Sequence, residues 1–312
     1  MRKHYTFLVL LFTVFIGNAQ IVNIPDANFK AKLLAASPSN GIAINATGQY
    51  LKIDTNNDGE IQVSEALSVY YLYVASSSIQ NLTGIEAFTN LISLNCSSNQ
   101  LTNLDVSQNT ALEVFYCGNN QLTNLDVSQN SELVNFKCNN NQLESLIMTP
   151  SLELRDIDCR YNQLTELNFT QNPNLLGLNC SFNELTSIDV SNNLMLDNFY
   201  CTNNNLTTID VSQNELLFDF NCSYNQLTFL DLSNNNNVYD VYCHNNLMTS
   251  IHLPTSHTSY LVDCNSNLIE FFDAYNKNFS SVNLSNNPNL VGINIKNKII
   301  NFISYIFKSP VD

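Results

Sequence analysis

The sequence has 312 residues, only 12% of them charged, and a formal net charge of −15 at neutral pH. Twelve lysine and arginine residues stand against 27 aspartate and glutamate residues, so the chain lacks the positive surface that nucleic acid or anionic lipid binding requires. The composition fits a protein that binds cations, basic partners or uncharged glycans.

A leader segment is predicted at the N-terminus. Residues 1–4 (MRKH) carry positive charge, residues 5–16 are apolar, and residues 17–19 (GNA) are small. This order is typical of a secretory signal peptide. The apolar run is shorter than the roughly 20 residues that cross a membrane, so we expect no membrane span. Cleavage after Ala19 would leave a mature chain of net charge −17, since two basic residues are lost, and would make it secreted or exposed at a cell surface.

The next segment, residues 20–68, is predicted to form a small N-terminal cap. Pro25 precedes a stretch with helical character, and we expect one helix over residues 26–36. Residues 44–53 (INATGQYLKI) form a poor helix, so no helix is expected to enter the polar loop that follows them.

That loop, residues 54–65 (DTNNDGEIQVSE), matches the calcium-loop pattern D-x-[DN]-x-[DN]-G-x5-E at every defined position. The pattern places oxygen ligands at alternate residues, a glycine at the sharp turn and a closing bidentate glutamate. The predicted ligands are Asp54, Asn56, Asp58, Glu60 through its carbonyl, and Glu65. The loop resembles a single EF-hand or dockerin loop, which implies a structural Ca²⁺ that ties the cap to the first repeat. The alternative is an acidic turn that holds no ion.

A fixed repeat of 21 residues governs the rest of the chain. Cysteines mark it at Cys96, Cys117, Cys138, Cys159, Cys180, Cys201, Cys222, Cys243 and Cys264. The aligned rows give the consensus LxxLxCxxNxLTxLDVSxNxx, in which LxxLxC and LTxLDV both alternate apolar and polar residues. A constant period of this length predicts a solenoid, and each alternating half predicts one short strand.

We therefore predict a mainly β solenoid over residues 69–295, with two short parallel strands per coil and about eleven coils. Residues 296–312 lack the pattern and are predicted to form a C-terminal tail, as a truncation would leave. The pattern resembles leucine-rich repeats. The 21-residue form with cysteine at a core position resembles the internalin J type of bacterial surface protein, which implies this fold and says little about the ligand.

The repeated cysteines and asparagines are interpreted as structural. Each cysteine lies two residues after a core position, so its side chain points inward, and parallel thiols about 4.8 Å apart do not converge as a disulfide requires. A line of thiols cannot surround a metal ion either. Three residues later an asparagine recurs, for example Asn99 and Asn183, and its amide can satisfy backbone groups where the chain turns.

The outward positions around the first strand of each row are varied and rich in aromatic and acidic residues. Those of the second strand repeat aspartate. A varied surface on a rigid scaffold suits recognition. The predicted binding residues are Tyr116, Asp156, Asp158, Tyr161, Phe182, Tyr200, Asp219, Tyr224, Asp240, Tyr242 and Asp263. The alternative is that tyrosine merely suits exposed strands.

The sequence thus predicts a non-catalytic, adhesin-like binding protein, monomeric, whose partner is a protein or glycan at a cell surface. Two alternatives remain: a spacer that organises surface assemblies, and a hydrolase of polysaccharides or peptides. Paired carboxylates such as Asp156 and Asp158 could imitate a glycosidase pair, but an open sheet does not exclude water. No nucleic acid partner is expected.

Overall fold

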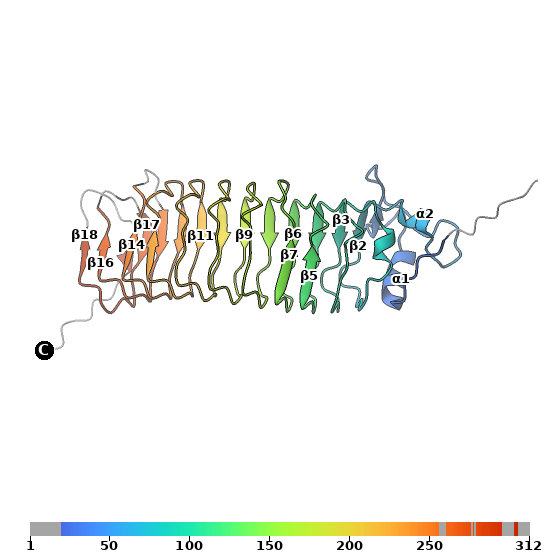
Figure 1. Ribbon diagram of the computed structural model, residues 1–312. Helices are drawn as coiled ribbons and strands as arrows, with labels where there is room; N and C mark the ends of the chain where they lie inside the picture. The colour runs from blue at the N-terminus through green and yellow to red at the C-terminus, as the bar shows by residue number, and fades with distance from the viewer. Residues whose placement is uncertain (1–19, 256–259, 276, 278, 295–302, 305–312) are drawn as a thin grey trace, which may run out of the picture.

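The computed structural model describes residues 20–294, apart from 256–259, 276 and 278, and also residues 303–304. The chain forms an elongated solenoid whose coils follow one another along the long axis, with the helices gathered at the N-terminal end (Figure 1). The predicted leader, residues 1–19, and most of the predicted tail, residues 296–312, lie outside the described residues.

The N-terminal cap contains helix α1 (Ala27–Leu34), strand β1 (Ala43–Ile44) and helix α2 (Val63–Ala66). The helix expected at 26–36 is present but begins after its cap residue, Asp26, and ends at Leu34. The short helix α2, which directly follows the polar loop, adds a second helix to the single one predicted. As expected, the residues that lead into the loop are not helical.

The carboxylate of Asp26 joins the cap to the first coil. Its Oδ1 accepts hydrogen bonds from the backbone N–H groups of Asn28 and Phe29, both at 2.9 Å, and so caps α1. Its Oδ2 accepts from the backbone N–H groups of Gln80, at 2.8 Å, and Asn81, at 3.0 Å. One side chain therefore holds both the helix and the first turn of the repeats.

The first strand of each coil belongs to a single thirteen-stranded sheet. Strand β1 pairs antiparallel with β2 at one edge, and the strands from β2 onward run parallel. Their bounds are β2 Tyr71–Tyr73, β3 Ser93–Asn95, β4 Val114–Tyr116, β6 Asn135–Lys137, β8 Asp156–Asp158, β9 Gly177–Asn179, β10 Asn198–Tyr200, β11 Asp219–Asn221, β13 Asp240–Tyr242, β15 Tyr260–Asp263, β17 Phe279–Asn283 and β19 Ile303–Ser304. The twelve parallel strands of the described chain, one per coil, agree within one with the roughly eleven coils predicted. Strand β19 extends the sheet past residue 295, where the prediction ended it.

The second half of the repeat is less regular than predicted. Strands form there in three separate pairs. They are β5 (Asn124–Val127) with β7 (Ser145–Met148), β12 (Phe229–Asp231) with β14 (Ser250–His252), and β16 (Phe271–Asp273) with β18 (Gly292–Asn294). The sequence LTNLDV occurs at both 101–106 and 122–127, yet only the second copy forms a strand. Pairing with the adjacent coil, and not local sequence, therefore decides strand formation on this side. The remaining element is a 3₁₀ turn at Ile85–Ala87.

The core is one continuous apolar column that begins in the cap and runs through the repeats. The cysteines and the apolar residues at the centres of the main-sheet strands are almost wholly buried, whereas the leucine or isoleucine of the second half is partly buried in several coils, such as Leu104 and Ile188. Phenylalanines on neighbouring strands stack, with ring centroids 5.5 Å apart for Phe115 and Phe136 and 5.6 Å apart for Phe199 and Phe220. This burial is the main stabilising term, because each coil is too thin to form a core alone.

All nine cysteines are free and buried, as the periodicity predicts. Some thiols donate a weak hydrogen bond to the next coil, such as the 3.5 Å contact from Cys180 Sγ to the carbonyl of Tyr200. Burial raises the pKa of the Cys96 and Cys180 thiols to about 12. The thiols are therefore neutral apolar fillers near neutral pH, because only the thiolate is a nucleophile or metal ligand.

This state of the cysteines predicts that the folded protein does not react with a thiol reagent. At pH 8 the native chain should release almost no chromophore from dithionitrobenzoate, and all nine thiols should titrate once guanidinium has unfolded it. Fast labelling of the native protein, or fewer than nine thiols after unfolding without a reductant, would contradict the structure.

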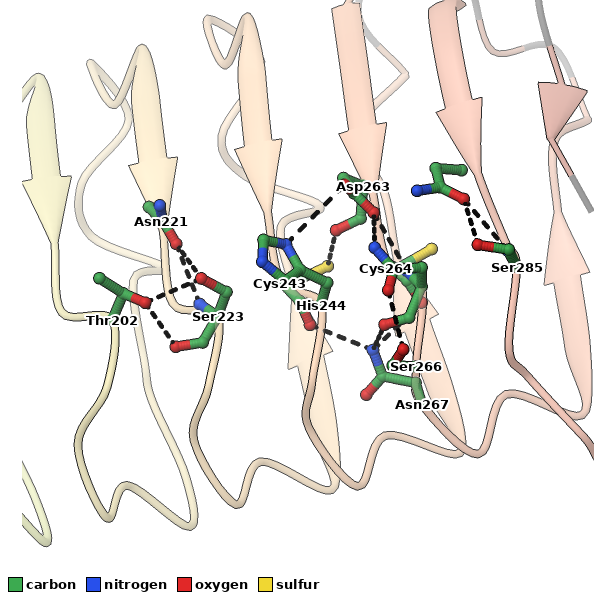
Figure 2. Close-up of polar contacts among 12 residues, drawn as sticks. Thr202, Asn221, Ser223, Cys243, His244, Asp263, Cys264, Ser266, Asn267 and Ser285 are labelled. Atoms are coloured by element: carbon green, nitrogen blue, oxygen red, sulfur yellow. Dashed lines mark hydrogen bonds and ion pairs between the residues drawn. The ribbon is translucent and has the colours of Figure 1, made fainter.

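The predicted asparagine row closes the turn after each first strand. The Nδ2 of Asn183 donates to the carbonyls of Cys159, at 3.1 Å, and Cys180, at 3.0 Å, while its Oδ1 accepts from the N–H of Leu164 at 3.0 Å. Asn267 holds Cys243 and Cys264 in the same way (Figure 2). Each amide thus satisfies backbone groups of two successive coils that the sheet leaves unpaired.

A second buried row of asparagines lies at the other end of the repeat. Asn214, for example, donates to the carbonyls of Val190, at 3.0 Å, and Asn193, at 2.9 Å. At the equivalent position near the C-terminal end, Lys277 is buried and its Nζ donates to the carbonyl of Leu253 at 2.7 Å. The sequence analysis gave these residues no role, although the consensus contains the asparagine.

Candidate binding surface

The outer face of the main sheet is formed by the first and third residues of each three-residue strand. In β10, Phe199 points into the core, while Asn198 and Tyr200 flank it and stay partly exposed. The strands lie in exact register, so Asn198, Asp219 and Asp240 are direct neighbours across β10, β11 and β13. The alternation predicted from the sequence therefore gives a continuous face on which residues of successive coils meet.

Two of the predicted binding residues meet through a hydrogen bond. The hydroxyl of Tyr200 donates to Asp219 Oδ2 at 2.5 Å. Burial and the neighbouring Asp219 raise the pKa of Tyr200, so its hydroxyl remains a donor throughout the physiological range. The other oxygen, Asp219 Oδ1, is buried and has no hydrogen-bond partner. Burial and Asp219 also raise the pKa of Asp240. Asp219 and Asp240 form no salt bridge within the described residues, so this part of the face is acidic.

A hollow lies beside this acidic region. Gly177 has no side chain to fill its place on the face, and a Cβ there would lie 2.4 Å from Asp156 Oδ1. The depression has a volume of about 400 Å³ and is lined by Asp156, Lys137 and Tyr200 among others. Burial and Asp197 raise the pKa of Asp156, and Lys137 acts in the opposite direction. The site could accept a small polar group from a ligand.

Other predicted residues serve the fold in addition to any contact with a ligand. Asp158 accepts a hydrogen bond from the backbone N–H of Arg160, and its Oδ2 lies 3.3 Å from Arg160 Nε. Asp263 likewise accepts from the backbone N–H of Asn265 at 3.2 Å. Aspartate or asparagine at this position caps the turn that ends the strand. From the sequence these positions were predicted only as contact residues. An aspartate or asparagine at the end of a strand can serve either as a contact residue or as the cap of an Asx turn, so the sequence does not distinguish the two roles.

The aromatic residues four places beyond the strand centre, Tyr161, Phe182 and Tyr224, lie in the turn and not on the sheet. All three have positive φ, between 52° and 56°. The rings of Tyr161 and Phe182 are exposed and stack, with centroids 4.2 Å apart. Serine or asparagine holds this left-handed position in most other coils, so the aromatic residues add strain and form a second row along the edge of the face.

The last two predicted contact residues stand apart from each other. Tyr116 is partly exposed, and Lys137 Nζ lies 5.0 Å from the centroid of its ring, a cation–π contact between adjacent coils. Tyr242 lies on β13, three coils from Gly177 and the hollow, and burial together with Asp240 raises its pKa.

A groove that was not predicted lies at the edge of the face, just before the first strands. It has a volume of about 920 Å³, and its exposed apolar residues are Met195, Leu216, Phe218 and Tyr239. A signal existed in the sequence. Phe218 and Tyr239 occupy the second place of consecutive rows, a position that points to solvent and that is charged in some other rows.

The loop 54–65 turns sharply at Gly59 and is held by its own polar side chains. Gly59 has φ 79°, and Asp54 Oδ2 accepts from its N–H at 3.3 Å. Asn56 Oδ1 accepts from the N–H of Asp58, and Asp58 Oδ1 from that of Glu60. The three polar side chains that the pattern names are therefore turned back onto the loop.

Both carboxylate oxygens of the closing glutamate, Glu65, accept hydrogen bonds from the loop. Glu65 Oε1 accepts from the N–H and hydroxyl of Thr55, both at 2.7 Å, and Oε2 accepts from the N–H of Gln62 at 3.1 Å. Asp54 is buried, and its Oδ1 has no hydrogen-bond partner. Across the described residues no three acidic, histidine or cysteine side chains are already arranged around a point where a metal ion could sit.

The loop is also fastened to the cap. Val22 N donates to the carbonyl of Ile61 at 2.8 Å, and Val63 N donates to that of Gln20 at 2.8 Å. Glu60 forms an ion pair with Lys30 of α1 at 2.7 Å. Residues 61–63 at the end of the loop thus pair antiparallel with residues 20–22.

No helix in the described part of the chain is long and apolar enough to cross a membrane. No protein-family model matches the sequence, and no curated protein matches it either.

Solved structures do match. YopM, a leucine-rich effector protein from Yersinia pestis, is 22% identical, with 75% of this chain and 73% of that chain covered and a TM-score of 0.55. Internalin C2 from Listeria monocytogenes is 18% identical, with coverage of 70% and 92% and a TM-score of 0.54. The functional domain of InlJ from Listeria monocytogenes, which includes a cysteine ladder, is 27% identical, with coverage of 90% and 72% and a TM-score of 0.49.

The fold is that of a leucine-rich repeat protein, as YopM and internalin C2 demonstrate and as the 21-residue repeat predicts. The chain is similar to bacterial proteins of this class, and internalins are among them.

Proposed function

We propose that the chain is a non-catalytic module that binds a protein at a cell surface, outside the cell that secretes it, through the outer face of the main sheet. The observation that carries this proposal is the face around β10, β11 and β13. There an unpaired buried carboxylate oxygen, Asp219 Oδ1, lies in an acidic region beside a hollow at Gly177. A buried carboxylate oxygen without a hydrogen-bond donor destabilises the fold, and a bound molecule that supplies a donor would remove that cost.

The rest of the molecule supports the same reading. The rigid, register-locked coils present side chains from many successive strands at fixed spacing, as a solenoid does when it recognises an extended partner. The carboxylates of the face lie on an open sheet, which favours recognition over hydrolysis, since water reaches them freely. The acidic composition favours a partner with basic residues.

The test is retention of surface proteins by the immobilised chain. Tyr200→Ala combined with Tyr242→Ala removes two aromatic side chains from the face and should lower retention about tenfold, since buried aromatic contacts carry much of the binding energy at interfaces. Phe229→Ala combined with Phe271→Ala is the matched control, because both phenylalanines are exposed on second-half strands. Equal losses for the two pairs, or retention of glycans alone, would contradict a protein-binding face.

We also propose that the loop 54–65 binds one structural Ca²⁺. The support is the complete ligand pattern and the buried, unpartnered Asp54 Oδ1, an oxygen that a cation would satisfy. Asp54, Asn56, Asp58, the carbonyl of Glu60 and Glu65 would hold the ion. Glu65 would exchange its bonds with Thr55 and Gln62 for it. The ion would fix the loop against residues 20–22 and α1 and so stiffen the cap.

Calcium should therefore raise the melting temperature, and EDTA should lower it. At a hundredfold excess over the dissociation constant, a bound ion adds about 2.7 kcal/mol to the free energy of unfolding. Asp54→Ala should abolish the difference, and Asp105→Ala, an exposed aspartate outside the loop, should leave it unchanged. If the unaltered protein melts at the same temperature with calcium and with EDTA, the loop is an acidic turn that binds no ion.

A further inference from the structure

The groove at the edge of the face presents apolar side chains that no part of the described chain covers. Met195, Leu216, Phe218 and Tyr239 are between 43% and 50% exposed. Phe218 and Tyr239 stack face to face, with centroids 5.3 Å apart and planes 5° from parallel. Rings held in this way form a flat, preorganised wall, which loses little entropy when a partner side chain packs against it.

Acidic side chains that form no salt bridge within the described residues lie in and beside the groove. Asp197 lines it directly. Asp219 and Asp240 directly follow Phe218 and Tyr239 in the chain and lie in register on neighbouring strands. No salt bridge of the described residues involves any of these three carboxylates.

Arg155 occupies the same place in its repeat as Asp197 but does not neutralise these carboxylates. Arg155 stands two coils before Asp197, and its Nη1 donates to the carbonyl of Asn174 at 3.2 Å. The groove therefore combines an apolar wall with the negative charge of Asp197, and Asp219 lies beside it on the strand that follows Phe218.

We propose that this groove binds an extended segment of a partner protein in which a lysine or arginine side chain lies next to a large apolar one. The apolar side chain packs between Met195, Leu216 and Phe218, and the cation pairs with Asp197, while the neighbouring Asp219 adds negative charge beside the groove. This inference rests on the proposed function and names the chemistry of the partner. Charge complementarity selects this occupant, because an acidic or purely apolar segment would leave the carboxylates unpaired.

Fluorescence anisotropy with short labelled synthetic peptides tests the proposal on the full chain. The probes alternate lysine with leucine, lysine with serine, or glutamate with leucine. The lysine–leucine peptide should bind saturably, the lysine–serine peptide at least about tenfold more weakly, and the glutamate–leucine peptide not at all. Added salt should weaken binding, since part of the attraction is between charges.

Two variants locate the site. Phe218→Ser and Asp219→Asn should each weaken binding of the lysine–leucine peptide about tenfold. Their matched controls, Phe229→Ser and Asp210→Asn, make the same changes at exposed second-half positions and should have no effect.

Absence of saturable binding, or equal effects of the Phe218, Asp219 and control variants, would overturn the proposal. If the peptides fail while Tyr200 and Tyr242 still control retention of surface proteins, only the partner chemistry named here is wrong. If retention by the face fails as well, the proposed function falls with it.

Discussion

Replacement of Asn183 by alanine should lower the free energy of unfolding by about 3 kcal/mol, more than almost any other polar substitution in the chain. The amide bonds two carbonyls and one backbone N–H at a position that is only 8% exposed. Alanine leaves these groups buried without partners, and a neighbouring coil cannot replace them because it uses its own asparagine. Urea denaturation monitored by circular dichroism measures the change.

The control is Asn205→Ala in the next coil. Asn205 is exposed, and its side chain makes only a marginal 3.5 Å contact with Gln226, so the stability change should stay within about 0.5 kcal/mol. Equal effects at the two positions would mean that the asparagine row is a feature of composition and does not hold the coils together.

Asp26→Ala should be the most damaging change in the cap and should cost about 2 kcal/mol. It removes the helix cap and, in the same step, both hydrogen bonds to the first coil at Gln80 and Asn81. Asp26→Asn keeps one acceptor oxygen and should cost about half as much. Glu166→Ala, at an exposed site in the repeats, should be neutral.

The same carboxylate makes stability depend on pH. Burial raises the pKa of Asp26, but the N–H groups of Phe29, Gln80, Asn81 and Asn28 outweigh it, so its pKa in the folded state lies below its ordinary value. Because the folded pKa is depressed, the contribution is complete above about pH 4 and is lost as the pH falls through the folded value. Asp26→Ala should therefore reduce the acid sensitivity of unfolding. An unchanged acid profile would show that these bonds do not stabilise the cap.

The sequence specified the fold almost completely because a solenoid repeats one local rule. Once Cys117 and Asn120 are placed, the same geometry holds for Cys138 and Asn141 and so on along the chain. What it could not specify was strand pairing on the second side. The copy of LTNLDV at 122–127 contains a strand, Asn124–Val127, and the copy at 101–106 contains none, since pairing depends on the adjacent coil.

The candidate site was predicted in part. The alternation of residues placed Tyr200 and Asp219 on one face, and the structure joins them by a hydrogen bond. Their row positions could not reveal that the carboxylates at Asp158 and Asp263 cap turns, or that Phe218 and Tyr239 border a groove. These properties depend on three-dimensional contacts within and between coils. A pattern of residue types along the sequence does not determine those contacts.

The most direct measurement of the central claim is hydrogen–deuterium exchange of the chain with and without the surface protein that it retains. The binding face proposed here predicts protection of backbone amides in β9, β10, β11 and β13 and in the segments just before them. It predicts no change in the second-half segments 185–190 and 206–211 of the same coils. Protection confined to those second halves, or none in the main sheet, would contradict the account.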